Sequence, residues 1–172
     1  MTEVYLGLGS NLGNRRENLR RSLRLLAEES ALVAVSSLYE TPPLVVPGID
    51  EPPPFYNAVV KLETRLDPRA LLRGAKAIEQ SLGRRSGIRW GPRPIDIDLL
   101  VHGAARMASE LLTVPHAGMA ERAFVLVPLA EIDGDLVPPG WQQSVAQAAA
   151  LTDQVGMQCL AGSEWASGLV AG

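Results

Sequence analysis

The sequence predicts an α+β domain in which two helices pack on an antiparallel sheet, in the order strand, helix, strand, strand, helix, strand. The first observation behind this prediction is a series of apolar segments whose period switches between two residues, as in strands, and about 3.6 residues, as in helices. The second is a pair of helix starts marked by capping residues. The third is the length of 172 residues, which suits one hydrophobic core. This order is the ferredoxin-like arrangement, and we expect a single domain over residues 1–172 that includes a C-terminal extension.

The first strand and the first helix are expected near the N-terminus. Residues 4–8 form a short apolar run that ends in glycine, serine and asparagine, which is typical of a strand that leads into a loop. Asn14 can cap a helix, with Glu17 three residues later. The apolar stripe of this helix is expected to consist of Leu19, Leu23 and Leu26.

The second and third strands flank a proline-rich loop. Residues 31–39 are apolar and β-branched, and they predict one strand. Residues 41–54 contain six prolines and predict a loop. Residues 55–65 alternate in polarity, so that Phe55 and Asn57 share one face of the third strand.

The second helix and the fourth strand complete the core. Asp67 is expected as the N-cap, Pro68 as the first helical residue and Gly83 as the terminator. Residues 94–101 alternate and predict the fourth strand. Beyond them, short apolar runs and a weakly helical, alanine-rich tail form the expected C-terminal extension.

Composition limits the classes of function. Lys and Arg total 16 against 19 Asp and Glu, a net charge of −3, so a general affinity for nucleic acid is not expected. The apolar stretches fall far short of the about 20 residues that a membrane helix needs, so no membrane association is expected. Cys159 is the single cysteine of the sequence, which fits a reducing compartment, and we expect a cytoplasmic protein.

The strongest local signal is the pair Asp96 and Asp98 in the fourth strand. Two aspartates at this spacing lie on the same face of a strand, about 6.6 Å apart along the backbone. Carboxylates so close repel each other, and Mg²⁺, which prefers hard oxygen ligands, would turn this repulsion into binding. An isolated pair of this kind is also typical of a solvated edge strand. The basic residues that precede the pair favour the metal site.

Four arginines, with no acidic residue among them, precede the aspartates: Arg84, Arg85, Arg89 and Arg93. Guanidinium groups match phosphate oxygens, and cations beside carboxylate-bound Mg²⁺ are typical of phosphoryl transfer. Glycines at positions 83, 87 and 91 give the segment hinges, and we expect it to close over a bound nucleotide. The alternative is a basic loop that contacts solvent or RNA.

A ring-binding site is expected on the third strand. The amide of Asn57 could hydrogen-bond a flat heterocycle that stacks on Phe55. Phe124 is the only other phenylalanine, and the sequence places it outside the predicted helix stripes that core filling would explain. The glycine-containing segment at residues 7–13 fits neither the dinucleotide fingerprint nor a P-loop.

The order and spacing of these motifs resemble the 6-hydroxymethyl-7,8-dihydropterin pyrophosphokinase family of folate biosynthesis over nearly the whole chain. The segment at residues 90–98 is the most specific of the motifs, which are residues 9–12, 41–43, 55–58, Glu79 with 83–84, 90–98, 112–116 and 122–124. The resemblance implies a ferredoxin-like core that binds ATP and two Mg²⁺ ions. It also implies transfer of pyrophosphate from ATP to the hydroxymethyl oxygen of the pterin, with release of AMP.

The resemblance further implies roles for individual residues. Asp96 and Asp98 would hold both Mg²⁺ ions and would form the catalytic group with Arg84 and Arg93. The residues that would bind the pterin are Pro43, Leu44, Phe55, Asn57 and Phe124. The residues that would bind ATP are Glu79, Arg84, Trp90, Arg93, Thr113, His116 and Arg122. The protein is expected to be a monomer whose partners are these two small molecules.

Two other classes of function fit the same pattern of elements. A ferredoxin-like RNA-binding module would use the arginine-rich segment as its basic patch and aromatic residues on the central strands as stacking platforms. Aromatic residues make up only 5% of the chain and the corresponding sheet motif is absent, which disfavours this class. The second alternative is an inactive relative that serves as a binding partner, and the retained aspartates and arginines disfavour it.

Overall fold

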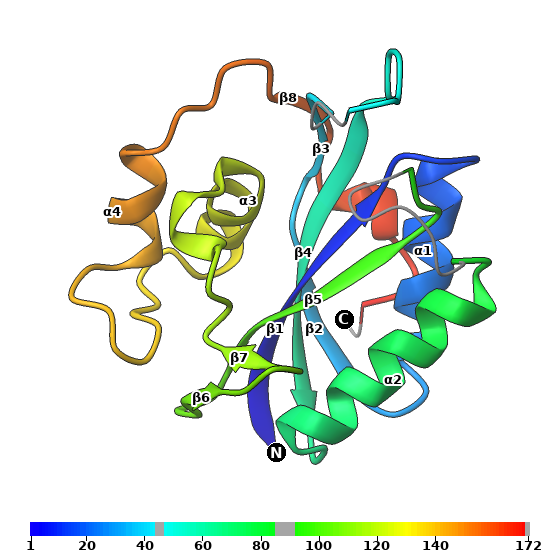
Figure 1. Ribbon diagram of the computed structural model, residues 1–172. Helices are drawn as coiled ribbons and strands as arrows, with labels where there is room; N and C mark the ends of the chain where they lie inside the picture. Colours follow the sequence, from blue (N-terminus) through cyan, green and yellow to red (C-terminus); the bar gives the residue numbers. More distant parts are fainter. Residues whose placement is uncertain (44–46, 85–91, 171–172) are drawn as a thin grey trace.

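The computed structural model of the chain describes residues 1–43, 47–84 and 92–170. The elements follow one another in this order: β1 (Thr2–Ser10), α1 (Arg15–Leu26), β2 (Ala31–Val35), β3 (Leu38–Thr41), β4 (Phe55–Thr64), α2 (Pro68–Ser81), β5 (Asp96–His102), β6 (Met107–Ala108), β7 (Thr113–Val114), η1 (Met119–Glu121), α3 (Ala123–Asp133), α4 (Val145–Ala150), β8 (Gln158–Ala161) and η2 (Ser163–Ala166). A central sheet separates α1 and α2 on one side from α3 and α4 on the other (Figure 1).

The central sheet places β1 and β4 in its middle. Its strands lie in the order β5, β1, β4, β3, β8, and β2 also pairs with β4. The pairs are antiparallel. The predicted α+β class with an antiparallel sheet is confirmed, and this order is consistent with a ferredoxin-like core in which β2 and β3 together take the place of the second strand.

The single strand expected at residues 31–39 is wrong in one respect, because the structure divides it into β2 and β3. At the division, Ser36 donates its backbone N–H to the Val59 carbonyl at 2.9 Å. Its side-chain oxygen accepts the Val59 N–H, also at 2.9 Å. The hydroxyl therefore replaces a backbone carbonyl in the ladder, and apolar periodicity does not reveal such a substitution.

The helices α1 and α2 begin and end where the sequence predicts. The side chain of Asn14 accepts the Glu17 N–H at 3.1 Å, and that of Asp67 accepts the Ala70 N–H at 2.8 Å. Gly83 follows α2 with a φ of +96°, a conformation that favours glycine. Leucines of both helices pack with alternate residues of β1, β4 and β5 in one apolar core.

The opposite face of the sheet is covered by α3 and α4, which the sequence does not predict as helices packed on the sheet. Tyr5, Val59 and Leu100 meet this pair of helices in a second apolar core. Phe124, which the sequence places outside the predicted helix stripes, belongs to the first turn of α3, a helix that the sequence does not predict, and it is only partly buried there. Its ring nevertheless faces the cavity described below.

The C-terminal extension crosses the edge of the sheet. Its strand β8 pairs with β3, and η2 then reaches the side on which α1 lies (Figure 1). Trp165 is fully buried there, donates its indole N–H to the Ser36 carbonyl at 2.8 Å, and accepts a hydrogen bond from Arg20 on its own carbonyl. Within the described ranges, no helix has the length and apolar character needed to cross a membrane.

Candidate active site

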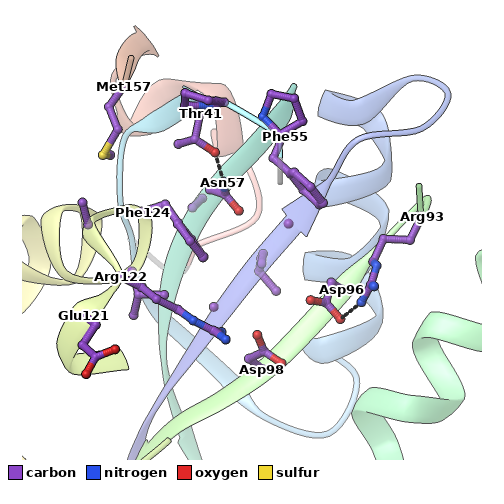
Figure 2. A pocket seen from close by; sticks show the side chains of 18 of the residues that line it. Thr41, Phe55, Asn57, Arg93, Asp96, Asp98, Glu121, Arg122, Phe124 and Met157 are labelled. Carbon is purple, nitrogen blue, oxygen red and sulfur yellow. Dashed lines mark hydrogen bonds and ion pairs between the residues drawn. The ribbon is translucent and has the colours of Figure 1, made fainter. Parts of the chain in front are cut away.

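A cavity of about 770 Å³ opens between α3 and the ends of the central strands. It brings together segments that are far apart in the sequence (Figure 2). Its walls include residues of β1, β3, β4, β5, α3 and the segment before β8: Gly7, Leu8, Gly9, Thr41, Pro42, Pro43, Pro47, Phe55, Asn57, Ala58, Arg93, Asp96, Asp98, Glu121, Arg122, Ala123, Phe124, Val125, Asp153, Val155 and Met157.

One end of the cavity suits a flat ring. The side chains of Phe55 and Phe124 approach it from opposite sides, and Asn57 lies between them (Figure 2). Asn57 donates from Nδ2 to the Thr41 hydroxyl at 2.6 Å, which leaves its Oδ1 as the acceptor on the cavity side. The predicted pterin residues Pro43, Phe55, Asn57 and Phe124 are thus brought together, whereas Leu44 lies outside the described residues.

The floor of this ring end is the backbone of β1. A Cβ atom on Gly9 would lie 2.9 Å from Asn57 Oδ1 and 3.6 Å from Phe55 Cδ1. A side chain at position 9 would displace the Asn57 amide, because 2.9 Å is too short for a contact between a Cβ atom and an oxygen. Glycine at position 9 therefore lets the amide and the ring sit directly on the strand, a requirement that the sequence analysis missed.

The other end of the cavity carries the two aspartates of β5. Asp96 and Asp98 both line the cavity, as their spacing predicts (Figure 2). Burial is the main cause that raises the pKa of Asp98 to about 6, and the charge of Asp96 is the second. The charged form of Asp98 is therefore destabilised by burial and by Asp96, and a cation at this position would stabilise it.

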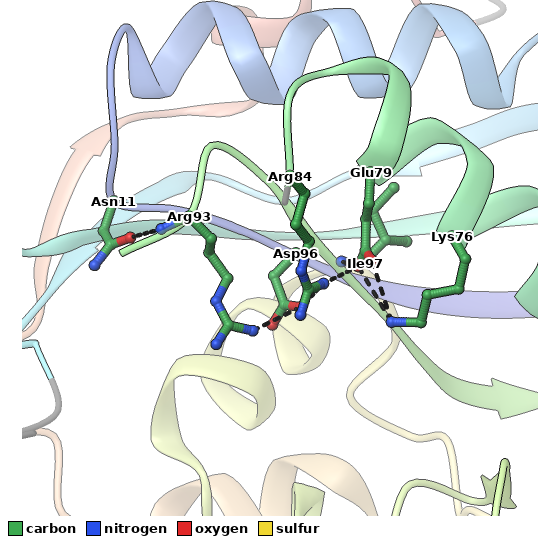
Figure 3. Close-up of polar contacts among 7 residues, drawn as sticks. All are labelled: Asn11, Lys76, Glu79, Arg84, Arg93, Asp96 and Ile97. Carbon is green, nitrogen blue, oxygen red and sulfur yellow. Dashed lines mark hydrogen bonds and ion pairs between the residues drawn. The ribbon is translucent and has the colours of Figure 1, made fainter. Parts of the chain in front are cut away.

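The arginine-rich segment has no acidic residue of its own, yet both of its arginines that the structure describes, Arg84 and Arg93, pair with carboxylates. Arg84 contacts Asp96 Oδ1 at 2.8 Å and Glu79 Oε1 at 2.6 Å (Figure 3). Arg93 contacts the same Asp96 oxygen at 3.3 Å. Guanidinium side chains are long enough to reach carboxylates on neighbouring elements, here Glu79 of α2 and Asp96 of β5. The positions of Arg85, Arg89 and Trp90, and the expected closure of this segment, lie outside the described residues.

Glu79 is buried behind β5 and supports the strand between the two aspartates. Its side chain is 2% exposed, and Oε1 accepts the backbone N–H of Ile97 at 2.8 Å, between the two aspartates (Figure 3). Lys76 contacts its other oxygen at 3.2 Å. Glu79 does not line the cavity, so the structure places it behind the site rather than on its surface.

Of the remaining described residues expected to bind ATP, only Arg122 lies on the cavity surface. Arg122 lines the cavity, with its guanidinium 5.8 Å from the centre of the Phe124 ring. His116 accepts the Gly118 N–H on Nδ1 at 3.1 Å, and Thr113 belongs to the short strand β7. Burial, and then the charge of Arg122, lower the pKa of His116 below its usual value. Neither His116 nor Thr113 lines the cavity itself.

Sequence reasoning missed Asn11 as a connector within the site. Asn11 is 2% exposed and accepts the Arg93 N–H on Oδ1 at 2.7 Å, while its own N–H donates to the Arg93 carbonyl at 3.2 Å (Figure 3). Its Nδ2 reaches the Pro53 carbonyl at 3.4 Å. The sequence signal that could have identified Asn11 is its position as a polar residue directly after the buried strand β1.

Within the described segments, no three His, Cys, Asp or Glu side chains gather into a cage for a metal ion. Asp96 and Asp98 alone fit Mg²⁺, because this ion is commonly held by one or two carboxylates and completed by phosphate oxygens and water.

Comparison with known proteins points to one family. Residues 5–134 match the family described as 7,8-dihydro-6-hydroxymethylpterin-pyrophosphokinase (HPPK). The chain is 44% identical over 160 residues to the 2-amino-4-hydroxy-6-hydroxymethyldihydropteridine pyrophosphokinase of Methylorubrum extorquens, which covers 92% of this chain and 98% of that protein. It is 46% identical over 136 residues to the mitochondrial folate synthesis bifunctional protein of Arabidopsis thaliana, and this match covers 78% of this chain.

The chain spans only part of several of these relatives, with 24% of the Arabidopsis bifunctional protein covered. Solved structures agree in fold. A crystal structure of Plasmodium falciparum HPPK-DHPS has a TM-score of 0.69 at 15% identity, over 87% of this chain and 45% of that one. A structure of HPPK-DHPS in complex with substrates has a TM-score of 0.71 at 15% identity, over 87% of this chain and 43% of that one.

Proposed function

Because the chain belongs to the 7,8-dihydro-6-hydroxymethylpterin-pyrophosphokinase family, we propose that it transfers pyrophosphate from ATP to the hydroxymethyl oxygen of 6-hydroxymethyl-7,8-dihydropterin and releases AMP. The observation that carries this proposal is the joining of a ring-binding end and a carboxylate end in one cavity. A substrate whose ring lies between Phe55 and Phe124 can then extend its hydroxymethyl group toward Asp96 and Asp98.

The ring end supports recognition of a pterin. The two phenylalanines offer a face on each side of a planar heterocycle. Asn57 presents Oδ1 as an acceptor because Thr41 holds its Nδ2, and the amino and ring N–H groups of a pterin are matching donors. Pro43 closes this end from the β3 side.

The carboxylate end supports the binding of two Mg²⁺ ions by Asp96 and Asp98, together with the phosphates of ATP. Bound there, Mg²⁺ would neutralise charge on the transferred phosphates. The ions would also offset the burial and the repulsion by Asp96 that together raise the pKa of Asp98. The two carboxylates orient the reacting groups, and Glu79 keeps the strand between them in place through Ile97.

Arg84 and Arg93 contribute by exchanging partners. Both contact Asp96 in the structure, so they neutralise part of its charge before a substrate enters. A polyphosphate offers more oxygens and more charge than one carboxylate, and charge-assisted hydrogen bonds to it are strong. The arginines therefore move a short distance from Asp96 to the phosphates, where they stabilise charge during transfer. Arg122, which lines the cavity, and His116 beside it contact the nucleotide.

Measurement of the nucleotide product tests the function. The purified protein is incubated with ATP and MgCl₂, with and without the hydroxymethyl dihydropterin, and AMP and ADP are separated by chromatography. AMP should form only with the pterin and in equal amount to a pterin diphosphate. Formation of ADP, or no pterin-dependent product, would contradict the proposal and favour another transfer or an inactive relative.

Matched aspartate variants test the residue assignment. Asp98→Asn should lower turnover by on the order of 100-fold, because it removes a cation ligand from the reacting centre. Asp135→Asn removes the same charge from an exposed position away from the cavity and should keep full turnover. Equal activity of both variants would refute the role of Asp98.

We also propose that the enzyme works as a cytoplasmic monomer. The exposed free thiol of Cys159 suits a reducing compartment. Both the ring end and the carboxylate end of the cavity are built from residues of this chain.

A further inference from the structure

The arm, defined here as residues 152–157 between α4 and β8, lies at the ring end of the cavity. Asp153, Val155 and Met157 line this cavity, and Figure 2 shows Met157 on the side of Phe124 and Thr41, far from Asp98. We propose that the arm is the third wall of the ring end and that Met157 is a specificity-determining residue that contacts the bound heterocycle. The proposal rests on the proposed function and names a further contact for its pterin substrate.

Local bonds give the arm a defined shape. Asp153 accepts the Val155 N–H on Oδ1 at 2.9 Å, and Gln154 accepts the Met157 N–H on its carbonyl at 3.1 Å. The strand β8 follows directly and pairs with β3, the strand that ends at Thr41. The arm is therefore anchored beside the residues that hold the Asn57 amide.

Gly156 allows the arm to pack against Pro42, the residue directly after β3. It has a φ of +81°, and a Cβ atom at this position would lie 2.5 Å from Pro42 Cγ. No side chain fits at that distance, so glycine allows the backbone of the arm to pack directly on Pro42. This packing fixes how far Val155 and Met157 stand from the ring end.

The arm presents apolar surface that a ring would cover. Val155 is 84% exposed and Met157 is partly exposed. A thioether is polarizable and gains stability from contact with the edge of an aromatic ring. Both residues lie beyond residues 5–134, over which the family match extends, so this wall is supplied by the C-terminal extension.

Calorimetry with matched variants tests the proposal. The dissociation constants of the hydroxymethyl dihydropterin and of a non-hydrolysable ATP analogue with Mg²⁺ are measured for the full chain and for Met157→Ala, Met157→Leu and Leu160→Ala. Met157→Ala should weaken pterin binding by about 3- to 10-fold and leave the ATP analogue unaffected. Met157→Leu should recover most of the loss, because it restores the apolar volume.

Leu160→Ala is the control, since Leu160 is 43% exposed on β8 and does not line the cavity. It should leave both dissociation constants unchanged. Gly156→Ala should mimic Met157→Ala because it lifts the arm from Pro42. An unchanged pterin affinity in Met157→Ala would refute the contact between Met157 and the heterocycle. If the wild-type chain still binds the pterin tightly in that case, the proposed function stands. Absence of pterin binding by the wild-type chain overturns both.

Discussion

Two glycines of β1 differ in what they allow at the ring end. A Cβ atom on Gly9 would lie 2.9 Å from Asn57 Oδ1, whereas one on Gly7 would meet only the Leu100 side chain at an ordinary 3.6 Å. Gly9 is therefore needed for the position of the Asn57 amide, and Gly7 is not. The pair offers a comparison in which the same methyl group is added two residues apart.

Gly9→Ala should weaken pterin binding by about 10-fold or more, because the displaced amide loses its hydrogen bond to the substrate. Binding of the ATP analogue should change much less. Calorimetry with each ligand measures both effects, and Gly7→Ala serves as the control with a smaller loss. An equal loss for both ligands in Gly9→Ala would indicate general damage to the sheet instead.

The pKa of His116 offers a test of the proposed nucleotide site. Its usual pKa of 6.5 is lowered by burial and by Arg122, so the folded protein resists the proton that the unfolded chain accepts. The stability that His116 contributes is therefore complete above pH 6.5 and is lost as the pH falls below that value.

Titration of the imidazole by NMR, with His116→Gln to assign its resonance, should give a pKa below the ordinary value in the free protein. Addition of the ATP analogue with Mg²⁺ should raise this pKa, because nearby phosphate oxygens stabilise the imidazolium form. A pKa that does not move on addition of the analogue would place His116 away from the nucleotide.

Individual site residues were predictable where their chemistry follows local spacing. The alternation of β5 is enough to place Asp96 and Asp98 on one face. The pairing of Arg84 with Glu79 and Asp96 was not predictable, because it depends on how α2 and β5 meet in space. The resemblance to the family supplied Glu79, but not its buried position behind the strand.

At the level of elements, Asn11 connects the end of β1 to two segments of the site. Its bonds to Arg93 hold the residues just before β5, and its contact with Pro53 holds the residues just before β4. A hydrophobic side chain in its place would leave the Arg93 N–H without this partner. Asn14, three residues later, instead caps α1 at the surface.

Asn11→Ala should lower the free energy of unfolding by about 1–3 kcal/mol and should also reduce kcat, because Arg93 loses its fixed backbone position. Asn14→Ala should cost about 1 kcal/mol through loss of the cap but leave kcat unchanged. Urea denaturation and steady-state kinetics separate these effects. If both variants keep normal turnover, Asn11 acts only in stability.

The elements that the sequence predicted well are those with local signals. Capping residues and an apolar stripe define α1 and α2 within one or two residues. By contrast, α3 is apolar around most of its circumference and contains Pro128, so it gives no amphipathic period. Its helical form depends on burial against the second face of the sheet, which only the folded chain provides.

At the scale of the whole molecule, the cavity depends on the attachment of α3 to the sheet. Glu131 of α3 accepts hydrogen bonds from the Tyr39 hydroxyl and the Ser37 N–H of the β3 region. Asp133 accepts the Tyr5 hydroxyl and contacts Lys61 at 3.4 Å. These contacts hold Phe124 and Arg122 opposite β4 and β5, and the C-terminal extension holds β3 from the other edge.

Trp165 should carry much of the stability of this C-terminal extension. Trp165→Ala should lower the free energy of unfolding by about 3–5 kcal/mol, because it empties a fully buried site. Trp165→Phe should cost less, through loss of the hydrogen bond to the Ser36 carbonyl. Urea denaturation measures both variants, and a loss under about 1 kcal/mol for Trp165→Ala would show that the extension is not cooperative with the core.

In the proposed site, one cavity places the hydroxymethyl group of the pterin beside a cation held by Asp96 and Asp98. Mn²⁺ can replace Mg²⁺ as a paramagnetic probe, with the ATP analogue and the pterin bound, and NMR then measures the line broadening of each pterin proton. The hydroxymethyl protons should broaden more than the ring protons, and Asp98→Asn should reduce the effect. Equal broadening of all protons, or none, would contradict the placement of the two ends in one site.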